Sequence, residues 1–138
     1  MANEYVLTME IAALPDVVWA VIGDATSVPR WFPKYVKCEV EGDVRTLTNA
    51  EGGVLVEQLL ERDDTVRRYA YQVTSGAPLK SHRASFQVIE ATIGSRVIWH
   101  TEAVFTDPAI DAETRLGPAQ RDGLARLKAL IEDGESAR

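Results

Sequence analysis

The chain has 138 residues, of which 46% are hydrophobic and 26% are charged, and this balance is typical of a folded globular protein rather than a disordered one. The length fits one domain with its own core, so we expect a single domain over residues 1–138, with its core over 4–132 and a frayed tail over 134–138. The formal net charge of −6 argues against nucleic-acid binding, because phosphate contacts need clustered Lys and Arg.

Cysteine and histidine are scarce. The single Cys38 excludes an internal disulfide and fits a reducing compartment, and it has no base partner that would make it a nucleophile. The two histidines are too far apart in the sequence to form a recognisable metal site, and no cofactor motif is present. Without a leader segment or a long apolar run, we expect a cytoplasmic monomer or homodimer with no stable membrane association.

The first third of the chain predicts one strand and two short helices. Residues 4–12 alternate between apolar and polar positions, which is typical of a half-buried strand. Pro15 opens a short helix that ends at Gly23-Asp24. Thr26 or Ser27 can cap a second helical turn that runs into Trp31-Phe32-Pro33.

After Pro33 the sequence alternates between strand-like segments and turn residues. Glycine, aspartate and proline separate the segments at regular intervals, which indicates antiparallel hairpins. The predicted strand pairs are 35–41 with 44–48 around Gly42-Asp43, the two halves of 55–73 around Arg62-Asp63-Asp64, and 80–91 with 95–106 around Ile93-Gly94.

The last region predicts a long helix over residues 118–133. Its apolar stripe consists of Leu124, Leu127, Leu130 and Ile131 at helical spacing. This helix is the only element long enough to cover the apolar face of the sheet, so an α+β fold is expected.

The final hairpin shows which face of the sheet is the core face. With Ile93-Gly94 as a two-residue turn, Val88 lies opposite Trp99 and His82 opposite Phe105, on a face that is otherwise apolar. We therefore predict that His82 and Trp99 point inward. His100 and Glu102 fall on the opposite face and are predicted to point outward.

The preceding hairpin is ambiguous. An odd-length turn places Leu55, Glu57 and Leu59 on the same face as Tyr69 and Tyr71, whereas an even-length turn sends Glu57 to solvent. Periodicity does not choose between them, because a slip of one residue exchanges the two faces of a strand.

Several local patterns, in this order, resemble the START-like helix-grip (SRPBCC) superfamily, especially its polyketide cyclase/dehydratase branch. The resemblance covers residues 4–132 and is carried by IAALPDVVWAVIGD, WFP, GDVR, GGVLVEQLLERDD, RRYAYQV, PLKSH and RVIWHTEAVF. It implies a curved antiparallel sheet of about seven strands wrapped around a long C-terminal helix, with two short helices after the first strand and a ligand cavity inside.

The resemblance also implies positions for individual side chains. Glu57 and Tyr71 would face the cavity, which favours the odd turn, and Arg45 matches an inward basic position. His82 stands where relatives often have Tyr. The loops at Gly52-Gly53 and residues 76–79 match the cavity mouth. Gly117-Pro118 departs from the family pattern, and there we expect the terminal helix to be kinked or delayed.

Each candidate also has a plainer structural interpretation. Glu57 is either a cavity carboxylate or half of a cross-strand ion pair with Arg45 or Arg68. His82 is either a proton shuttle or a strand-end histidine bonded to backbone or to a Tyr hydroxyl. Trp99 and Trp31 either line the cavity or belong to the core. The predicted ligand-binding residues are Trp31, Arg45, Glu57, Leu59, Tyr69, Tyr71, His82, Phe86 and Trp99.

Two functions of different classes fit these features. One is the binding or transfer of a small hydrophobic molecule, such as a lipid, a polyketide or an aromatic metabolite. The other is a cyclase/dehydratase in which Glu57 or His82 removes a proton beside a ketone and Arg45 stabilises the enolate. Binding is favoured, because no tightly specified acid–base pair can be identified in the sequence.

Overall fold

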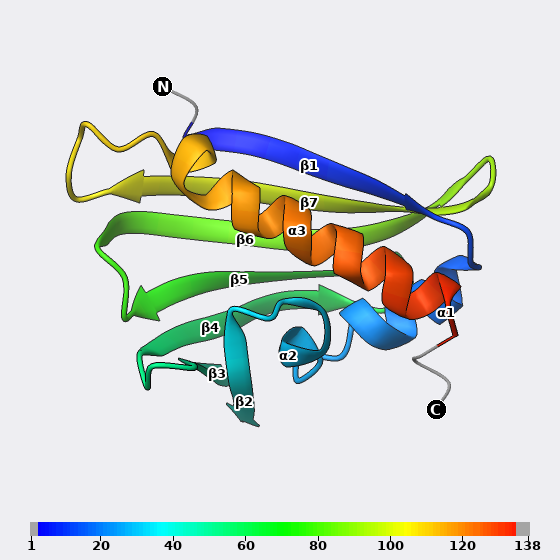
Figure 1. Cartoon of the computed structure of the whole chain (residues 1–138), viewed down its shortest axis with the longest axis horizontal. Coiled ribbons are helices and arrows are strands. Elements are labelled where there is room, and N and C mark those ends of the chain that lie inside the picture. The colour runs from blue at the N-terminus through cyan, green and yellow to red at the C-terminus, as the bar shows by residue number, and fades with distance from the viewer. Residues whose placement is uncertain (1–2, 135–138) are drawn as a thin grey trace.

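The computed structural model describes residues 3–134 and has one sheet with a long helix across its concave face (Figure 1). The elements are β1 (Glu4–Ile11), α1 (Pro15–Ile22), α2 (Val28–Trp31), β2 (Tyr35–Glu41), β3 (Val44–Asn49), β4 (Val54–Asp63), β5 (Arg68–Ser75), β6 (Leu79–Ala91), β7 (Gly94–Phe105) and α3 (Ala112–Glu132). This arrangement confirms the predicted helix-grip fold.

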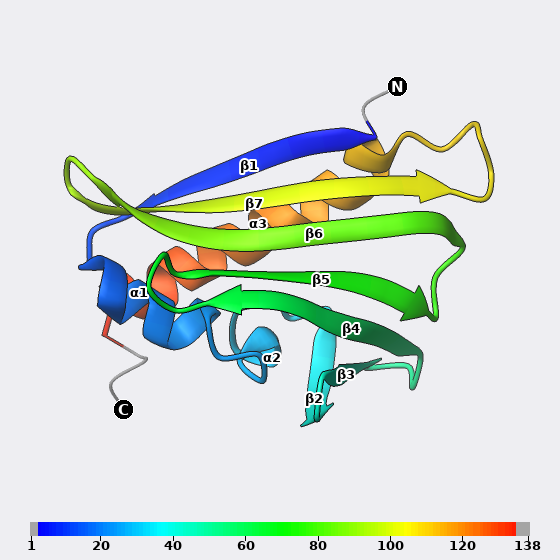
Figure 2. The ribbon, with the colours of Figure 1, turned by 180° about the vertical axis from the view of Figure 1, so that it is seen from behind.

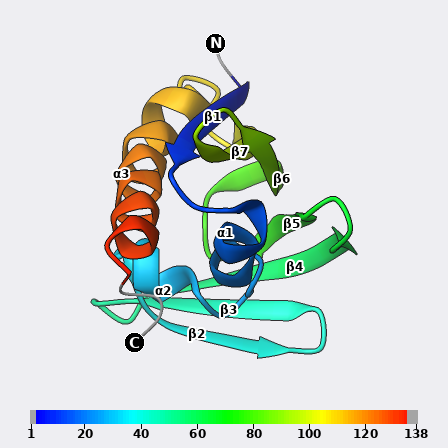
Figure 3. The same cartoon turned by 90° about the vertical axis from the view of Figure 1, so that its right-hand side faces the viewer.

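The seven strands form a single antiparallel sheet in the order β1-β7-β6-β5-β4-β3-β2. Strands β2 to β7 each pair with their neighbour in the sequence, and β1 adds to the free edge of β7. Seen from behind, the strands lie in front of α3, so the helix covers only one face of the sheet (Figure 2). The view along the molecule shows how the sheet bends around the helix (Figure 3).

The alternation in the first strand is confirmed. Tyr5, Leu7 and Ile11 are buried on its inward face, and Leu7 pairs with Trp99 of β7. Val6, Thr8 and Glu10 alternate with them on the outward face, with Val6 as an exposed apolar exception, and this is the pattern of a sheet with one covered face.

The side-chain cap that was predicted for the second short helix, from Thr26 or Ser27, is not formed. Neither helix has a side-chain cap at its N-terminus. The Ser27 hydroxyl instead accepts a hydrogen bond from Trp31 Nε1 at 3.2 Å, and Thr26 donates to Asp24. The Ser27 side chain therefore holds the indole of Trp31 in the core.

The first hairpin matches the prediction, with Gly42 at φ +62° in the turn between Glu41 and Val44. The second turn was predicted at residues 62–64, and this is wrong: it lies at 64–67. A bulge between Leu59 and Arg62 lengthens β4 beyond the predicted turn, and such an extra residue leaves no periodic signal.

The last hairpin also has a corrected register. Ala91 pairs with Gly94, so the turn residues are Thr92 and Ile93, and Phe86 rather than Val88 lies opposite Trp99. Gly94 serves a close backbone approach, because a Cβ there would lie 2.6 Å from the Ile11 carbonyl oxygen. The shift is two residues, so it preserves the predicted faces.

The long helix begins six residues earlier than predicted. Asp111 caps it by accepting a hydrogen bond from the Thr114 backbone N–H at 3.1 Å, and Pro118 lies inside the helix. The predicted delay of the helix at Gly117-Pro118 is therefore wrong, because a capped start and the burial of Ala112 stabilise the first turn. A kink at Gly117-Pro118 stays a prediction. No helix among residues 3–134 combines the length and apolar composition needed to cross a membrane.

Candidate functional site: a cavity between the sheet and the long helix

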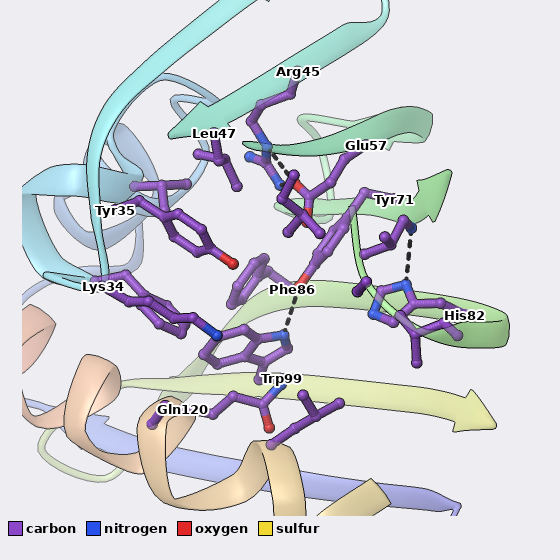
Figure 4. Close-up of a pocket in the computed structure, with 18 of the residues that line it drawn as sticks. Lys34, Tyr35, Arg45, Leu47, Glu57, Tyr71, His82, Phe86, Trp99 and Gln120 are labelled. Carbon is purple, nitrogen blue, oxygen red and sulfur yellow. Dashed lines mark hydrogen bonds and ion pairs between the residues drawn. The ribbon is translucent and has the colours of Figure 1, made fainter. Parts of the chain in front are cut away.

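A cavity of about 140 Å³ lies between the concave face of the sheet and the first turns of α3 (Figure 4). Side chains from β2 to β7, from α2 and from the loop between β5 and β6 complete its wall. Ala77 of that loop and Leu79 at the start of β6 line the cavity, as expected of the mouth, whereas Gly52 and Gly53 are not among its described lining residues.

Most of the predicted ligand-binding residues line this cavity. The lining includes Trp31, Arg45, Glu57, Tyr71, His82, Phe86 and Trp99. Leu59 and Tyr69 are not among the described lining residues: Leu59 is half-buried, and Tyr69 is buried with its hydroxyl bonded to Arg45. The second hairpin places Glu57 and Tyr71 on one face, as the odd-length alternative predicts, since Glu57 pairs with Val73 and Leu59 with Tyr71. The turn at 64–67 has four residues, and the bulge between Leu59 and Arg62 produces this shared face.

The central polar feature is an ion pair between Arg45 and Glu57, which face each other on β3 and β4. Both Nε and Nη2 of Arg45 lie 2.7 Å from Glu57 Oε1. The two side chains are only 2% and 6% exposed, so the pair is removed from water. Contacts of this length are typical of charge-assisted hydrogen bonds. The cavity-facing and ion-pair interpretations of Glu57 therefore both hold.

The surroundings of Arg45 fix its guanidinium in place. Its Nη1 donates to the Ala25 carbonyl at 3.1 Å and to the Tyr69 hydroxyl at 3.2 Å, and its guanidinium lies 5.0 Å from the ring centre of Tyr71. Burial lowers the pKa of Arg45, but Tyr69 and Glu57 together raise it by more than burial lowers it, so the net shift of the pKa is upward. Arg45 is therefore a fixed positive charge at one wall of the cavity.

Glu57 keeps one oxygen free. Both contacts with Arg45 use Oε1, and among the described residues Oε2 has no hydrogen-bond partner. Burial raises the pKa of Glu57, and the guanidinium of Arg45 opposes part of this rise. The free oxygen can thus accept a hydrogen bond or a proton from a molecule in the cavity.

His82 is held by the backbone. Its Nδ1 accepts a hydrogen bond from the Val73 N–H at 3.1 Å, so Nε2 carries the proton of the neutral ring. Burial lowers the pKa of His82 to about 4. A neutral ring with this low pKa and an occupied Nδ1 is a poor proton acceptor at pH 7, which favours the plainer interpretation of His82.

Aromatic rings form the floor of the cavity. Trp99 Nε1 donates to the Tyr71 hydroxyl at 3.0 Å, and the rings of Phe86 and Trp99 lie 4.5 Å apart. Trp31 meets both Phe86 and Trp99 edge-on at 5.7 Å. These contacts keep the rings in fixed orientations, so the floor is a preformed apolar surface.

Four polar lining residues were missed in the sequence: Lys34, Tyr35, Arg115 and Gln120. Burial, and then Glu57, raise the pKa of Tyr35 to about 12, and its hydroxyl points into the cavity (Figure 4). The buried Gln120 amide accepts from Tyr5 at 2.6 Å and donates to Thr101 at 3.3 Å. Its position four residues before Leu124, on the same stripe, was the available signal.

Other reactive groups lie elsewhere. Burial raises the pKa of the Cys38 thiol, whose sulfur lies 3.5 Å from the Ala25 carbonyl oxygen. Among residues 3–134, the one group that could hold a metal is Glu4, His100 and Glu102 on the outer face of β1 and β7, with both carboxylates exposed. This placement confirms that His100 and Glu102 point outward, away from the cavity.

Comparison with known proteins agrees with this architecture. The family described as "polyketide cyclase / dehydrase and lipid transport" matches residues 4–132. No curated protein matches the chain. The similar solved structures include the protein XoxI from Bacillus cereus, with 29% identity and a TM-score of 0.87 over 96% of this chain and 97% of that one.

Two further structures have the same fold. An uncharacterised protein from Bacillus thuringiensis is 27% identical, with a TM-score of 0.84 over 93% of this chain and 98% of that one. A point mutant of norcoclaurine synthase from Thalictrum flavum, in complex with a transition-state analogue, is 19% identical, with a TM-score of 0.72 over 96% and 95%.

Proposed function

The chain belongs to the polyketide cyclase/dehydrase and lipid transport family, and we propose that it binds a small hydrophobic molecule in the cavity beneath its sheet. The single observation that carries this proposal is the preformed cavity, with an aromatic floor and a few fixed polar groups. Such a combination is typical of small-molecule sites, in which apolar walls give affinity and a few polar groups fix orientation.

Two polar groups inside the cavity are available to a ligand. Glu57 Oε2 is a free acceptor, and the hydroxyl of Tyr35 faces the same space (Figure 4). The Arg45 guanidinium is already engaged by Glu57, Tyr69 and the Ala25 carbonyl. A bound molecule therefore has an apolar body over Phe86 and Trp99, and Glu57 Oε2 can accept a hydrogen bond from any donor group that this body carries.

A ligand panel tests this proposal directly. Small aromatic and aliphatic molecules are screened by thermal shift and native mass spectrometry, and hits are expected to raise the melting temperature, because they bind only the folded state. Ala119→Phe, which places a ring in the cavity, should abolish the shift. Ala129→Phe, at an exposed position of the same helix, should leave it unchanged. Equal stabilisation of both variants would show that binding occurs elsewhere.

A second candidate is enzymatic, and Glu57 is the observation that favours it. A buried carboxylate with a raised pKa and a free oxygen can remove a proton beside a ketone, and the adjacent Arg45 can stabilise the enolate oxygen. The fold does not decide between the two candidates, because one fold can host both binding proteins and enzymes. Norcoclaurine synthase, which shares this fold, is named as an enzyme. We assign proton removal to Glu57 rather than to His82, because Nδ1 of His82 already accepts the Val73 N–H and burial lowers the pKa of the ring to about 4.

Variants at two lining positions test the enzymatic candidate. Glu57→Gln should abolish turnover of a cyclisable ketone while the ligand still binds. His82→Gln, which keeps an acceptor for the Val73 N–H, should retain most of the activity. Retained turnover in Glu57→Gln would remove this residue from the mechanism.

The cytoplasmic location, the monomeric or dimeric state and the lack of nucleic-acid binding stay predictions from the sequence.

A further inference from the structure

The cavity carries an excess of positive charge that the rest of the chain does not share. Its described lining has three cationic side chains, Lys34, Arg45 and Arg115, and one carboxylate, Glu57. His82 is neutral at pH 7, because burial lowers its pKa to about 4. The whole chain has a formal net charge of −6. The cavity is therefore a locally positive region on an acidic protein.

Two of these charges, Lys34 and Arg115, form what we call the cationic rim. Both side chains are exposed, whereas Arg45 and Glu57 lie deeper and are buried. Lys34 immediately precedes β2, and Arg115 lies in the first turns of α3, so the rim draws on two distant parts of the chain. In Figure 4 the amino group of Lys34 points towards the cavity.

The cationic rim has no carboxylate partners among the described residues. Elsewhere cationic side chains are commonly paired, as in Arg67 with Asp16 and Arg96 with Glu10. Both cations of the rim lie near aromatic rings. Lys34 Nζ lies 5.7 Å from the ring centre of Tyr35, and the Arg115 guanidinium lies 5.8 Å from the ring centre of Phe105. These weak contacts leave both charges available to an anion.

The size of the cavity limits the apolar part of the ligand. At about 140 Å³ it is smaller than the roughly 300–1,000 Å³ of sites for drug-sized ligands. It is close to the roughly 150 Å³ of an engineered apolar cavity that binds benzene. A single aromatic ring can also pack edge to face against the fixed rings of Phe86 and Trp99.

We propose that the ligand is a monocarboxylate with a single aromatic ring, whose ring occupies the cavity and whose carboxylate lies at the cationic rim between Lys34 and Arg115. This inference rests on the proposed binding function and narrows it to one chemical class. The carboxylate stays partly hydrated at the rim, so its interaction with each cation is weak individually and sensitive to salt.

Isothermal titration calorimetry with matched probes tests the anionic group. The wild-type protein should bind 3-phenylpropionate about tenfold more tightly than the uncharged 3-phenylpropan-1-ol at low ionic strength, and this ratio should shrink as salt is added. Lys34→Gln and Arg115→Gln should each weaken binding of the acid by about threefold to fivefold and leave the alcohol unchanged. Lys80→Gln and Arg126→Gln are controls at exposed positions that no described ion pair involves, and neither should change the ratio.

Different outcomes separate this inference from the proposal on which it rests. Equal affinity for the acid and the alcohol, both lost in Ala119→Phe, would overturn the anionic ligand and support cavity binding. Equally tight binding of 3-(2-naphthyl)propionate would overturn the restriction to one ring. If neither phenyl probe binds, the inference fails, and the ligand panel above decides separately whether the cavity binds anything.

Discussion

The space beneath the sheet has two halves along the same helix, α3, yet one half is solid and the other is hollow. In the half near α1, the last turns of α3 bury Leu124, Leu127 and Ile131 in the main core cluster. In the other half, the first turns of α3 contribute Leu116, Ala119 and other residues to the wall of the cavity.

The difference follows from the residues at inward positions. In the solid half they are aliphatic: Ile11, Val18, Ile22 and Val97 have no measurable exposure. In the hollow half, Arg45 is bonded to Glu57, and Gln120 to Tyr5 and Thr101. Side chains held by cross-links of this kind cannot collapse into a void as aliphatic chains do, so the polar contacts keep the cavity open.

The largest expected effect tests the polar half. Arg45→Leu leaves Glu57 buried without its cation, and breaking such a pair should lower the free energy of unfolding by about 3–5 kcal/mol, measured by urea denaturation. The control is the double variant Arg45→Leu with Glu57→Leu, which removes both charges and should recover most of the loss. A double variant as unstable as the single one would show that the pair itself stabilises the fold.

The next effect tests the solid half. Leu127 is fully buried on α3, and Leu127→Ala should lower the free energy of unfolding by about 3 kcal/mol, because a cavity remains where the side chain was. Leu127→Met keeps most of the volume and should cost less than about 1.5 kcal/mol. A small loss in the alanine variant would mean that this half also tolerates empty space.

The pH dependence of stability gives a third test, again in the hollow half. Burial lowers the pKa of His82 from its ordinary 6.5 to about 4. Between these pH values the unfolded chain binds a proton that the folded protein excludes, so stability falls as the pH drops from 6.5 to 4. We expect this residue to contribute about 2 kcal/mol to that loss, after allowance for its partial exposure.

Urea denaturation across this pH range, with two matched variants, isolates the contribution of His82. His82→Gln should flatten the fall in stability between pH 6.5 and 4. His100→Gln, on the outer face beside Glu4, should not remove it. An unchanged pH profile in His82→Gln would show that the ring is protonated in the folded protein as readily as in the unfolded chain.

The smallest effect is expected where the helix already borders empty space. Leu116 is half-buried at the wall of the cavity, eleven residues before Leu127 on the same helix. Leu116→Ala removes fewer contacts and should lower the free energy of unfolding by only about 1 kcal/mol. A loss as large as that of Leu127→Ala would mean that Leu116 packs as tightly as a core residue.

Residues with a periodic or turn-forming pattern were predicted well. The alternation of β1, the Gly42-Asp43 turn and the stripe of Leu124, Leu127 and Ile131 all appear in the structure. The turn of the second hairpin, the register of the last hairpin and the start of α3 were predicted wrongly, because a bulge, the close backbone approach at Gly94 and the Asp111 cap depend on the contacts of single residues. Residues 135–138 of the predicted tail lie outside the described part of the chain.

The candidate site divides in the same way. Glu57 and Arg45 were found through the family resemblance, and the structure brings them together across neighbouring strands. Lys34 and Arg115 come from segments far apart in the sequence, and no local pattern links them to a cavity.

The sequence by itself determined the order of elements, the inward face of the last hairpin and the family, because periodicity and turn chemistry are local properties that each segment carries alone. Only the tertiary structure decided that Glu57 both pairs with Arg45 and keeps an oxygen free. It also decided that His82 Nδ1 accepts a hydrogen bond from the Val73 N–H, and that Lys34 and Arg115 line the same cavity. These features depend on distances between segments, which the chain acquires only when the sheet bends around the helix.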